Sequence, residues 1–285
     1  MPSIFTFSNQ KGGVGKTTSV INISYLIANK GLKVLVVDID PQGNATSGFG
    51  IDKSAISNSS YDLFVNDVKF ISTLLTNVYK NIDVVPSLPD LAGAEVELVS
   101  QVGREFQLRQ KLSGAIDRYD AVFIDCPPSL GLLTLNALTT AQHLMIPLQC
   151  EYYALEGLGQ LIHTFQIVKN RLNPALEIGG VILTMADTRT KLTTQVVEDV
   201  RKHFGEKVFR TVIPRSVRLS EAPSYGKPIS VYAKDSKGAK SYADLSEEFF
   251  ERFWGGGGKG APPDVREETK GLEREPISKE KTVAI

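Results

Sequence analysis

Short apolar runs alternate along the chain with longer amphipathic stretches. The short runs are apolar throughout, which is typical of strands covered by helices on both faces of a sheet. Strands that alternate with helices favour right-handed crossovers and a parallel order. The pattern predicts an α/β fold, a doubly wound and mainly parallel sheet with helices on both faces, which binds ligands at the carboxyl ends of its strands. The expected strands are 4–8, 33–39, 82–86, 121–125, 143–148, 178–185 and 208–213, and the expected helices are 16–30, 92–114, 130–140, 155–172, 192–204 and 239–254.

The C-terminal end of the chain differs in composition from the rest. Four glycines at 255–258 follow the last expected helix, and 259–285 combine prolines and mixed charges with few apolar residues. Such a segment buries too little apolar surface to fold alone. We therefore expect one domain over 1–254 and a flexible glycine-rich linker and tail over 255–285. Residues 51–81 are less regular, and we expect a surface excursion with short helices there.

Composition narrows the possible classes of protein. The 285 residues are 42% hydrophobic, enough for one sizeable α/β domain. The formal net charge is zero, so any affinity for nucleic acid or membrane must come from a local patch. Cys126 and Cys150 make no disulfide framework, which suits a reducing cytoplasm. Because no stretch approaches the ~20 apolar residues that span a bilayer and no signal peptide is recognisable, we expect a cytoplasmic protein without membrane contact.

A glycine-rich loop lies between the first expected strand and the first expected helix. Its backbone N–H groups can turn toward an anion, and the helix N-terminus adds partial positive charge. Lys16 is expected to reach the β- and γ-phosphates of a nucleotide, and the Thr17 hydroxyl to bind Mg²⁺. The sequence thus predicts a phosphate-binding loop, with these residues in contact with the nucleotide: Lys11, Gly12, Gly13, Val14, Gly15, Lys16, Thr17 and Thr18.

The first position of this loop departs from the standard pattern. G-x-x-x-x-G-K-[ST] requires glycine at position 10, where Gln10 stands, and the loop carries a second lysine, Lys11. One lysine suffices to hold phosphates within a subunit, so a second at the loop mouth could reach a phosphate across an interface. A chance glycine cluster with solvated lysines is the alternative, and the strand-to-helix context argues against it.

Aspartates end two further expected strands at the same edge of the sheet. Asp38 and Asp40 close the second strand, and Asp40, which lies further out, can orient or deprotonate a water that attacks the γ-phosphate. Residues 44–46, which follow this turn, are then expected to form a switch segment that senses the γ-phosphate. Asp125 ends an apolar run in the Walker B arrangement and is expected to hold Mg²⁺ through a water. A turn cap is the alternative for Asp40, and Cys126 is expected to be a small buried residue.

Together, the motifs at 11–17, 38–44 and 124–128 resemble the deviant-Walker ATPases that include ParA, Soj and MinD. The resemblance covers about 2–254, and the motifs at 40–44 and 213–223 are similar to the Soj/ParA partition branch. It implies ATP and Mg²⁺ as cofactors, an ATP-dependent homodimer and slow hydrolysis stimulated by a ParB/Spo0J-type partner. It also implies ATP-gated binding to non-specific double-stranded DNA and association with the nucleoid. Lys11 would then contact the partner's phosphates, and Asp40 would position the hydrolytic water. The resemblance implies Lys11, Lys16 and Asp40 as the catalytic residues. It implies Thr17, Asp40 and Asp125 as the residues that hold the metal.

Adenine contacts are expected in two late loops, by the same resemblance. Met185 follows one expected strand, and Pro214 and Arg215 follow the next. Asn22, on the first helix, is a weaker candidate. Loop packing is an equally good interpretation of Met185 and Pro214.

Positive charge gathers in the C-terminal third of this neutral chain. Residues 201–240 contain ten Lys or Arg and three acidic residues. Two joined patches in a dimer would follow a phosphate backbone in a sequence-independent, salt-dependent manner, whereas solvated helix faces are the common alternative. The resemblance favours Arg189 and Arg218 as DNA contacts, followed by Arg215 and Lys227. Lys202 and Lys237 are more speculative.

Three other functions compete with DNA segregation. A MinD-like membrane-associated positioning ATPase would need a basic amphipathic C-terminal helix, but the aromatic residues of 247–254 are interspersed with acids. An iron–sulphur reductase of the nitrogenase type is disfavoured by the presence of only two cysteines. A metabolic ATP-dependent ligase or kinase would need a small-substrate pocket, which the sequence does not indicate.

Overall fold

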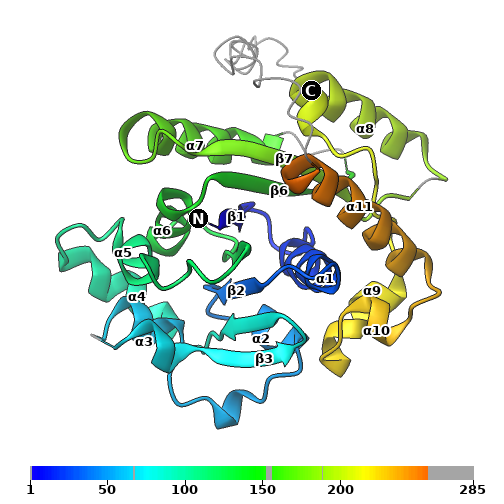
Figure 1. The fold of residues 1–285 in the computed structure, drawn as a ribbon. Helices are drawn as coiled ribbons and strands as arrows, with labels where there is room; N and C mark the ends of the chain where they lie inside the picture. Colours follow the sequence, from blue (N-terminus) through cyan, green and yellow to red (C-terminus); the bar gives the residue numbers. More distant parts are fainter. Residues whose placement is uncertain (1, 67, 152–155, 188, 256–285) are drawn as a thin grey trace, which may run out of the picture. The chain divides into compact units, whose positions relative to one another are not determined.

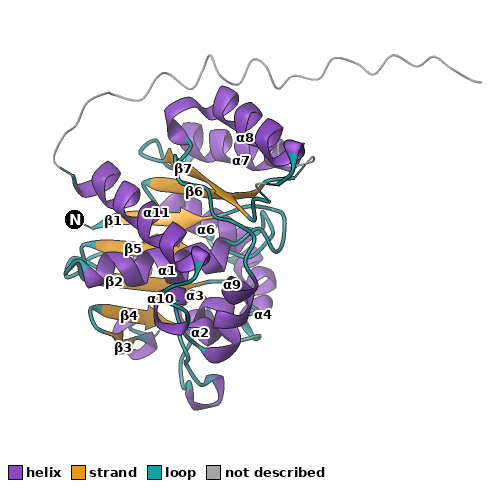
Figure 2. Ribbon diagram, turned by 90° about the vertical axis from the view of Figure 1, so that its right-hand side faces the viewer, coloured by secondary structure: helices purple, strands orange, loops and turns teal. Residues whose placement is uncertain are grey.

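In the part of the chain that the structure describes, seven strands form one sheet (Figure 1), in the order β3-β4-β2-β5-β1-β6-β7, which can be followed in Figure 2. The computed structural model describes residues 2–66, 68–151, 156–187 and 189–255. All strand pairs are parallel except β3–β4, which is antiparallel. The predicted doubly wound, mainly parallel α/β fold is thereby confirmed. The strands are β1 (Ser3–Phe7), β2 (Val34–Asp38), β3 (Leu75–Tyr79), β4 (Ile82–Val85), β5 (Ala121–Asp125), β6 (His143–Gln149) and β7 (Glu177–Thr184).

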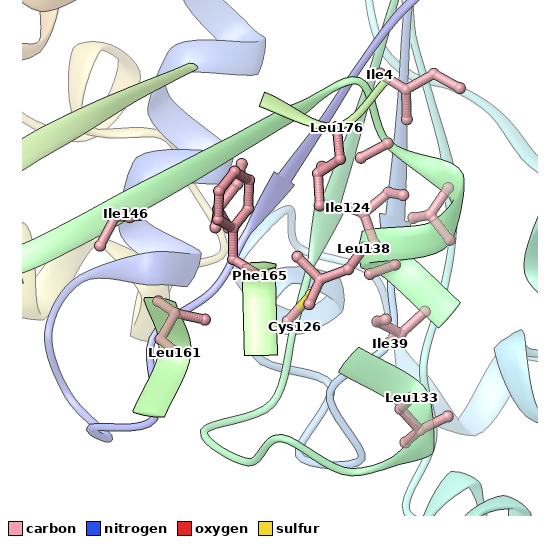
Figure 3. Close-up of a cluster of buried hydrophobic side chains, with 14 of the residues drawn as sticks. Ile4, Ile39, Ile124, Cys126, Leu133, Leu138, Ile146, Leu161, Phe165 and Leu176 are labelled. Carbon is pink, nitrogen blue, oxygen red and sulfur yellow. The ribbon is translucent and has the colours of Figure 1, made fainter. Parts of the chain in front are cut away.

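Helices cover both faces of the sheet (Figure 2). One apolar cluster joins the sheet to α6, α7 and α8 through residues such as Leu138, Phe165 and Val200. Figure 3 shows part of this cluster, including Leu138 and Phe165. The other joins it to α1 and α11 through Ile23 and Phe249. The helices are α1 (Lys16–Asn29), α2 (Asn44–Gly48), α3 (Ser60–Phe64), α4 (Leu91–Glu97), α5 (Gln107–Leu112), α6 (Leu132–Thr140), α7 (Gly159–Arg171), α8 (Lys191–Phe204), α9 (Val217–Glu221), α10 (Ile229–Tyr232) and α11 (Lys237–Trp254).

The strand register brings the predicted site residues to one edge of the sheet. In β5, Asp125 lies opposite Phe7 of β1 on one side and opposite Asp38 of β2 on the other. Because parallel strands end at the same edge, the loop that follows β1 emerges beside both aspartates. This arrangement follows directly from the central position of β1 and β5.

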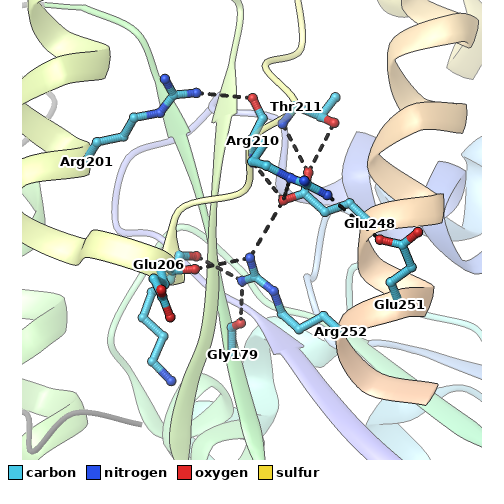
Figure 4. Close-up of polar contacts among 9 residues, drawn as sticks. Gly179, Arg201, Glu206, Arg210, Thr211, Glu248, Glu251 and Arg252 are labelled. Atoms are coloured by element: carbon cyan, nitrogen blue, oxygen red, sulfur yellow. Dashed lines mark hydrogen bonds and ion pairs between the residues drawn. The ribbon is translucent and has the colours of Figure 1, made fainter. Parts of the chain in front are cut away.

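The predicted strand at 208–213 is wrong. Isolated bridges at Val181–Val208 and Ala186–Pro214, and single backbone hydrogen bonds from Phe209 and Ile213 to β7, join this segment to the sheet in place of a continuous ladder. The carboxylate of Glu248, in α11, accepts hydrogen bonds from the backbone N–H groups of Arg210 (2.8 Å) and Thr211 (3.1 Å) (Figure 4). A side chain therefore takes the N–H of Thr211, which a regular ladder would have directed to β7 between the donors of Phe209 and Ile213.

Two other predictions of secondary structure need correction. The expected helix at 92–114 divides into α4, a 3-10 turn (Leu98–Ser100) and α5, with Gly103 at a left-handed φ of 67° between them. Strand β3 was not predicted. It is a partly exposed edge strand with an irregular register and a left-handed residue, Asn77. The excursion at 51–81 contains the expected short helices together with this strand.

The compact unit of the fold spans Met1–Gly255. The predicted linker and tail at 255–285 lie outside the described residues except for Gly255.

Candidate functional site

The loop between β1 and α1 has the backbone that its glycines allow. Gly13 and Gly15 adopt left-handed φ values of 73° and 89°, which L residues with a Cβ rarely adopt. Gly15 is the N-cap of α1, so the N-terminus of a 14-residue helix opens directly behind the loop. The hydroxyl of Thr184, at the end of β7, donates to the carbonyl of Val14 (2.8 Å) and fixes the loop to the sheet.

Lys16 points back into this loop. Its ammonium donates to the carbonyls of Asn9 (3.2 Å) and Lys11 (3.3 Å), at the loop's start. Burial lowers the pKa of Lys16, and the nearby carboxylates of Asp125 and Asp40 partly oppose that shift. The only strongly buried cation of the loop is thus held where an anion between loop and helix would meet it.

Asp125 is a buried carboxylate without a conventional partner. It is fully buried, and neither carboxylate oxygen has a hydrogen-bond partner of normal geometry among the described residues. Burial and the neighbouring Asp38 carboxylate raise the pKa of Asp125 well above its ordinary range, although Thr17 and Lys16 act in the opposite direction. An orphaned buried carboxylate beside a threonine hydroxyl fits the hard-oxygen donor set of Mg²⁺.

Asp38 and Asp40 have different surroundings. The fully buried Asp38 accepts hydrogen bonds from the backbone N (2.8 Å) and hydroxyl (2.7 Å) of Thr46 in α2. Burial nevertheless raises the pKa of Asp38 to about 6. The Asp40 carboxylate accepts one hydrogen bond from the described residues, from the backbone N of Gln42 (2.9 Å). Asp38 is therefore committed to anchoring α2, and Asp40 has acceptor capacity left for a ligand or water.

Lys11 turns away from the loop interior. Its side chain is 47% exposed and forms an ion pair with Glu151, just after β6. The preceding Gln10 donates to the side chain of Gln160 in α7 (2.7 Å). The two lysines of the loop thus have separate environments, since Lys16 is buried inside it and Lys11 lies at its mouth.

The loops predicted to contact adenine run side by side. The backbone N of Ala186 donates to Ile213 (3.0 Å), and that of Arg215 donates to Ala186 (3.0 Å). This pairing places Met185, which has a left-handed φ of 53°, beside Pro214. The side-chain amide of Asn22 is engaged internally, because it accepts from the backbone of Ile229 and donates to that of Thr18.

All four predicted DNA contacts are exposed, and two are paired with local acids. Arg189 donates to both carboxylate oxygens of Asp187 (2.9 and 2.7 Å), which lowers the pKa of Asp187 to about 2. Arg218 donates to Glu221 (2.9 Å). A phosphate would therefore compete with a carboxylate at these two positions, whereas Arg215 and Lys227 are not ion-paired with any acid among the described residues.

A contact that the sequence did not indicate connects α2 to the segment that carries these basic residues. Helix α2 packs on the 3-10 turn η6 (Ala222–Tyr225). There the backbones of Gly50 and Gly226 touch, since a Cβ on Gly226 would lie 2.5 Å from the Gly50 Cα. Both glycines have left-handed φ values, 77° and 61°. We call residues 215–227 the basic segment below.

Comparisons with known proteins agree with this geometry. A family model described as an AAA domain, AAA_31, matches residues 2–178. The chain is 53% identical over 248 residues to the sporulation initiation inhibitor protein Soj of Bacillus subtilis, covering 87% of this chain and 98% of that protein. It is 50% identical over 252 residues to the chromosome-partitioning ATPase Soj of Treponema pallidum, covering 88% and 98%. A solved structure of cobyrinic acid a,c-diamide synthase from Mycobacterium smegmatis, with bound ADP and magnesium, is 36% identical with a TM-score of 0.78, covering 91% and 98%.

Proposed function

The chain belongs to the ParA/Soj family of chromosome-partitioning ATPases, and from that premise we propose that it is an ATP-gated DNA-binding switch. ATP with Mg²⁺ joins two copies into a homodimer, which binds non-specific double-stranded DNA of the nucleoid. A ParB/Spo0J-type protein stimulates slow hydrolysis and returns the dimer to monomers.

Nucleotide binding rests on the loop and the carboxylates beside it. The backbone N–H groups of 12–18 and the ammonium of Lys16 bind the phosphates. Thr17 and Asp125 would hold Mg²⁺, with Asp40 close by, and the metal would offset the charge of the phosphates. Asp40 orients the attacking water and accepts its proton. Met185, Pro214 and Arg215 are proposed to contact the adenine, because their loops lie together.

Dimerisation rests on Lys11. Its place at the loop mouth, paired with Glu151 rather than with the buried carboxylates, supports a role outside its own loop. We assign it to the phosphates of the second copy, where it would exchange Glu151 for a stronger anion.

One observation carries the link between ATP and DNA: the contact of α2 with the basic segment. Helix α2 is tied to Asp38 through Thr46 and follows directly after Asp40, so a change at the γ-phosphate reaches it first. Helix α2 also packs on η6, which lies between Arg218 and Lys227, and just beyond these elements the backbones of Gly50 and Gly226 touch. A shift of α2 therefore displaces two of the proposed DNA contacts, Arg218 and Lys227, while Arg189 and Arg215 complete the surface.

The C-terminal helix gives no support to the membrane-associated alternative. Phe249, Phe253 and Trp254 of α11 pack against Phe5 of β1 at ring-centroid distances of 4.9, 4.7 and 5.8 Å. These aromatic side chains are therefore engaged by the sheet. No helix in the described part of the chain is long and apolar enough to cross a bilayer.

DNA retention measured with no nucleotide, ADP and ATP, across a range of salt concentrations, tests the proposal. We expect retention only with ATP and a steep loss with salt. Gly50→Ala should bind ATP and lose ATP-dependent retention, because a Cβ there would lie 2.9 Å from the Gly226 carbonyl. Gly114→Ala is the matched control, with a similar φ of 71° and no atom within 4 Å of its Cβ. Equal retention in all three nucleotide states would contradict the switch.

A further inference from the structure

The segment that follows β4 closes over the turn that carries Asp40. Ser87 is fully buried in the connection from β4 to α4. Its hydroxyl donates to the backbone carbonyl of Asp40 (2.7 Å) across 47 positions of sequence. The same carbonyl accepts from the backbone N of Gly43 (2.7 Å), so two donors fix the peptide group that follows the Asp40 side chain.

Ser87 is also hydrogen-bonded to helix α2. Its backbone N donates to the hydroxyl oxygen of Thr46 (2.9 Å), and that hydroxyl in turn donates to Asp38 (2.7 Å). A continuous series of hydrogen bonds thus runs from Asp38 in β2 through Thr46 in α2 to Ser87 and back to Asp40. Such a closed series leaves the turn little freedom to move alone.

The fit of the backbone around Ser87 is equally close. A Cβ on Gly43 would lie 2.6 Å from the Ser87 carbonyl oxygen. Gly43 has a left-handed φ of 57°, and it is the N-cap of α2. The turn at 40–43 is therefore held between the end of β2 and the chain at 87, with no room for a side chain at Gly43.

We propose that Ser87 is a positioning residue for ATP hydrolysis, which holds the Asp40 carboxylate at the angle needed to orient the attacking water. This inference rests on the proposed role of Asp40. Among the described residues the Ser87 hydroxyl bonds only to the Asp40 carbonyl, so its loss should leave ATP affinity intact and reduce turnover. A displacement of about 1 Å in a catalytic group can cost ~100-fold in rate, and we expect a 10- to 100-fold lower kcat for Ser87→Ala.

The test compares Ser87→Ala with a matched serine that has no such partner. Ser246 of α11 is also buried, and its hydroxyl has no hydrogen-bond partner among the described residues, so Ser246→Ala removes the same atom without a contact. For both variants and the wild type, hydrogen–deuterium exchange of peptides covering 40–48 is measured without nucleotide. ATP affinity and single-turnover hydrolysis are measured on the same preparations, together with Asp40→Ala and the Ser87→Ala/Asp40→Ala double variant.

The inference predicts faster exchange at 40–48 in Ser87→Ala alone, unchanged ATP affinity, lower kcat and no further loss when Asp40 is already absent. Exchange equal to that of Ser246→Ala would overturn it, because the turn would not depend on the serine. Faster exchange with wild-type kcat would also overturn it, since the turn would then be held for another purpose. Failure of the proposed function is visible separately: Asp40→Ala would hydrolyse ATP like the wild type, which removes the basis of the inference as well.

Discussion

Strand β7 contributes to two charged regions of the molecule that are organised in opposite ways. At its end, Thr184 holds the phosphate loop beside Lys16 and Asp125. Near its start, the carbonyl of Gly179 accepts a hydrogen bond from Arg252 (3.1 Å), part of an arginine–glutamate cluster formed by Arg201, Arg210, Glu248 and Arg252 (Figure 4). A buried carboxylate lies in each region, which makes the two directly comparable.

In the arginine–glutamate cluster, the partly buried charges are satisfied. Glu248 accepts from the backbone N of Arg210 and from the backbone and hydroxyl of Thr211. Arg252 donates to three backbone carbonyls and stacks on Phe209, with its guanidinium carbon 3.9 Å from the ring centroid. The cluster lines a cavity of about 550 Å³, yet its groups already have partners.

At the loop, by contrast, neither oxygen of the Asp125 carboxylate has a hydrogen-bond partner of normal geometry among the described residues, and this carboxylate lies close to those of Asp38 and Asp40. Burying an unpaired charge costs free energy, so such a group is expected where a bound ligand offsets that cost. The unsatisfied carboxylate, and not the presence of a cavity, therefore distinguishes the candidate binding site from the structural cluster. Four substitutions test this distinction.

Lys16→Ala should have the largest effect. Removing a buried ammonium that we propose binds the phosphates should weaken ATP binding by about 100-fold or more, or ~3 kcal/mol. Titration with a fluorescent ATP analogue measures the loss. Lys30→Ala, which removes an ion pair with Glu247 on the protein surface, is the control and should bind normally. ATP binding by Lys16→Ala at wild-type affinity would show that the buried charges of the loop do not bind the nucleotide.

Glu248→Ala should act on stability instead of function. It leaves two backbone N–H groups and Arg252 without their carboxylate, which should lower the free energy of unfolding by about 3 kcal/mol. Urea denaturation measures this change, and the folded fraction should keep wild-type ATP affinity. Glu251→Ala, whose side chain is 68% exposed, should cost less than about 1 kcal/mol. A selective loss of ATP affinity in Glu248→Ala would make the cluster part of the site.

Asp125→Asn should stabilise the nucleotide-free protein, by about 1 to 2 kcal/mol, because it removes a carboxyl group that folding must either protonate or bury as an unpaired charge. The raised pKa of Asp125 means that the folded state favours the protonated carboxyl. Its contribution to stability is therefore present at low pH and lost as pH rises through the folded-state pKa. The advantage of Asp125→Asn over the wild type should grow with pH in thermal melts.

The same variant should lose the stabilisation that ATP with Mg²⁺ confers on the wild type, and chelation of Mg²⁺ should reproduce that loss in the wild type. A variant that is less stable than the wild type at every pH would show that Asp125 is paired in solution.

Thr184→Val should have the smallest effect. It removes one neutral hydrogen bond to the Val14 carbonyl and keeps the shape of the side chain. The free energy of unfolding should therefore fall by about 1 kcal/mol. ATP affinity should fall by a similar amount, since the loop loses its attachment to β7. A joint decrease in ATP affinity and stability would show that this hydrogen bond holds the loop, and an unchanged affinity would show that the loop is held by its glycines alone.

Much of the site could be predicted because each motif is continuous in sequence. The loop at 11–18, Asp40 and Asp125 each follow an apolar strand, and a parallel sheet brings strand ends together whatever the rest of the chain does. Their placement at one edge followed from that pattern.

The remaining features depend on distant partners. Glu248 diverts the backbone of 210–211 from 37 positions away, and Ser87 reaches Asp40 across 47. Strand β3 was missed because its half-exposed residues lack an apolar pattern. Neither the ion pair of Lys11 with Glu151 nor the meeting of Gly50 with Gly226 has a local signal, since each arises from chain segments that only the folded sheet brings together.

The proposed ATP-dependent dimer is tested most directly at Lys11. This lysine distinguishes a loop that binds phosphates only within its own chain from a loop that also binds those of a second copy. Sedimentation velocity of Asp40→Ala, with ADP and with ATP, should show a dimer only with ATP. Lys11→Ala in that background should still bind ATP through Lys16 and remain monomeric. An ATP-dependent dimer of the Lys11→Ala/Asp40→Ala variant as tight as that of Asp40→Ala would contradict the account.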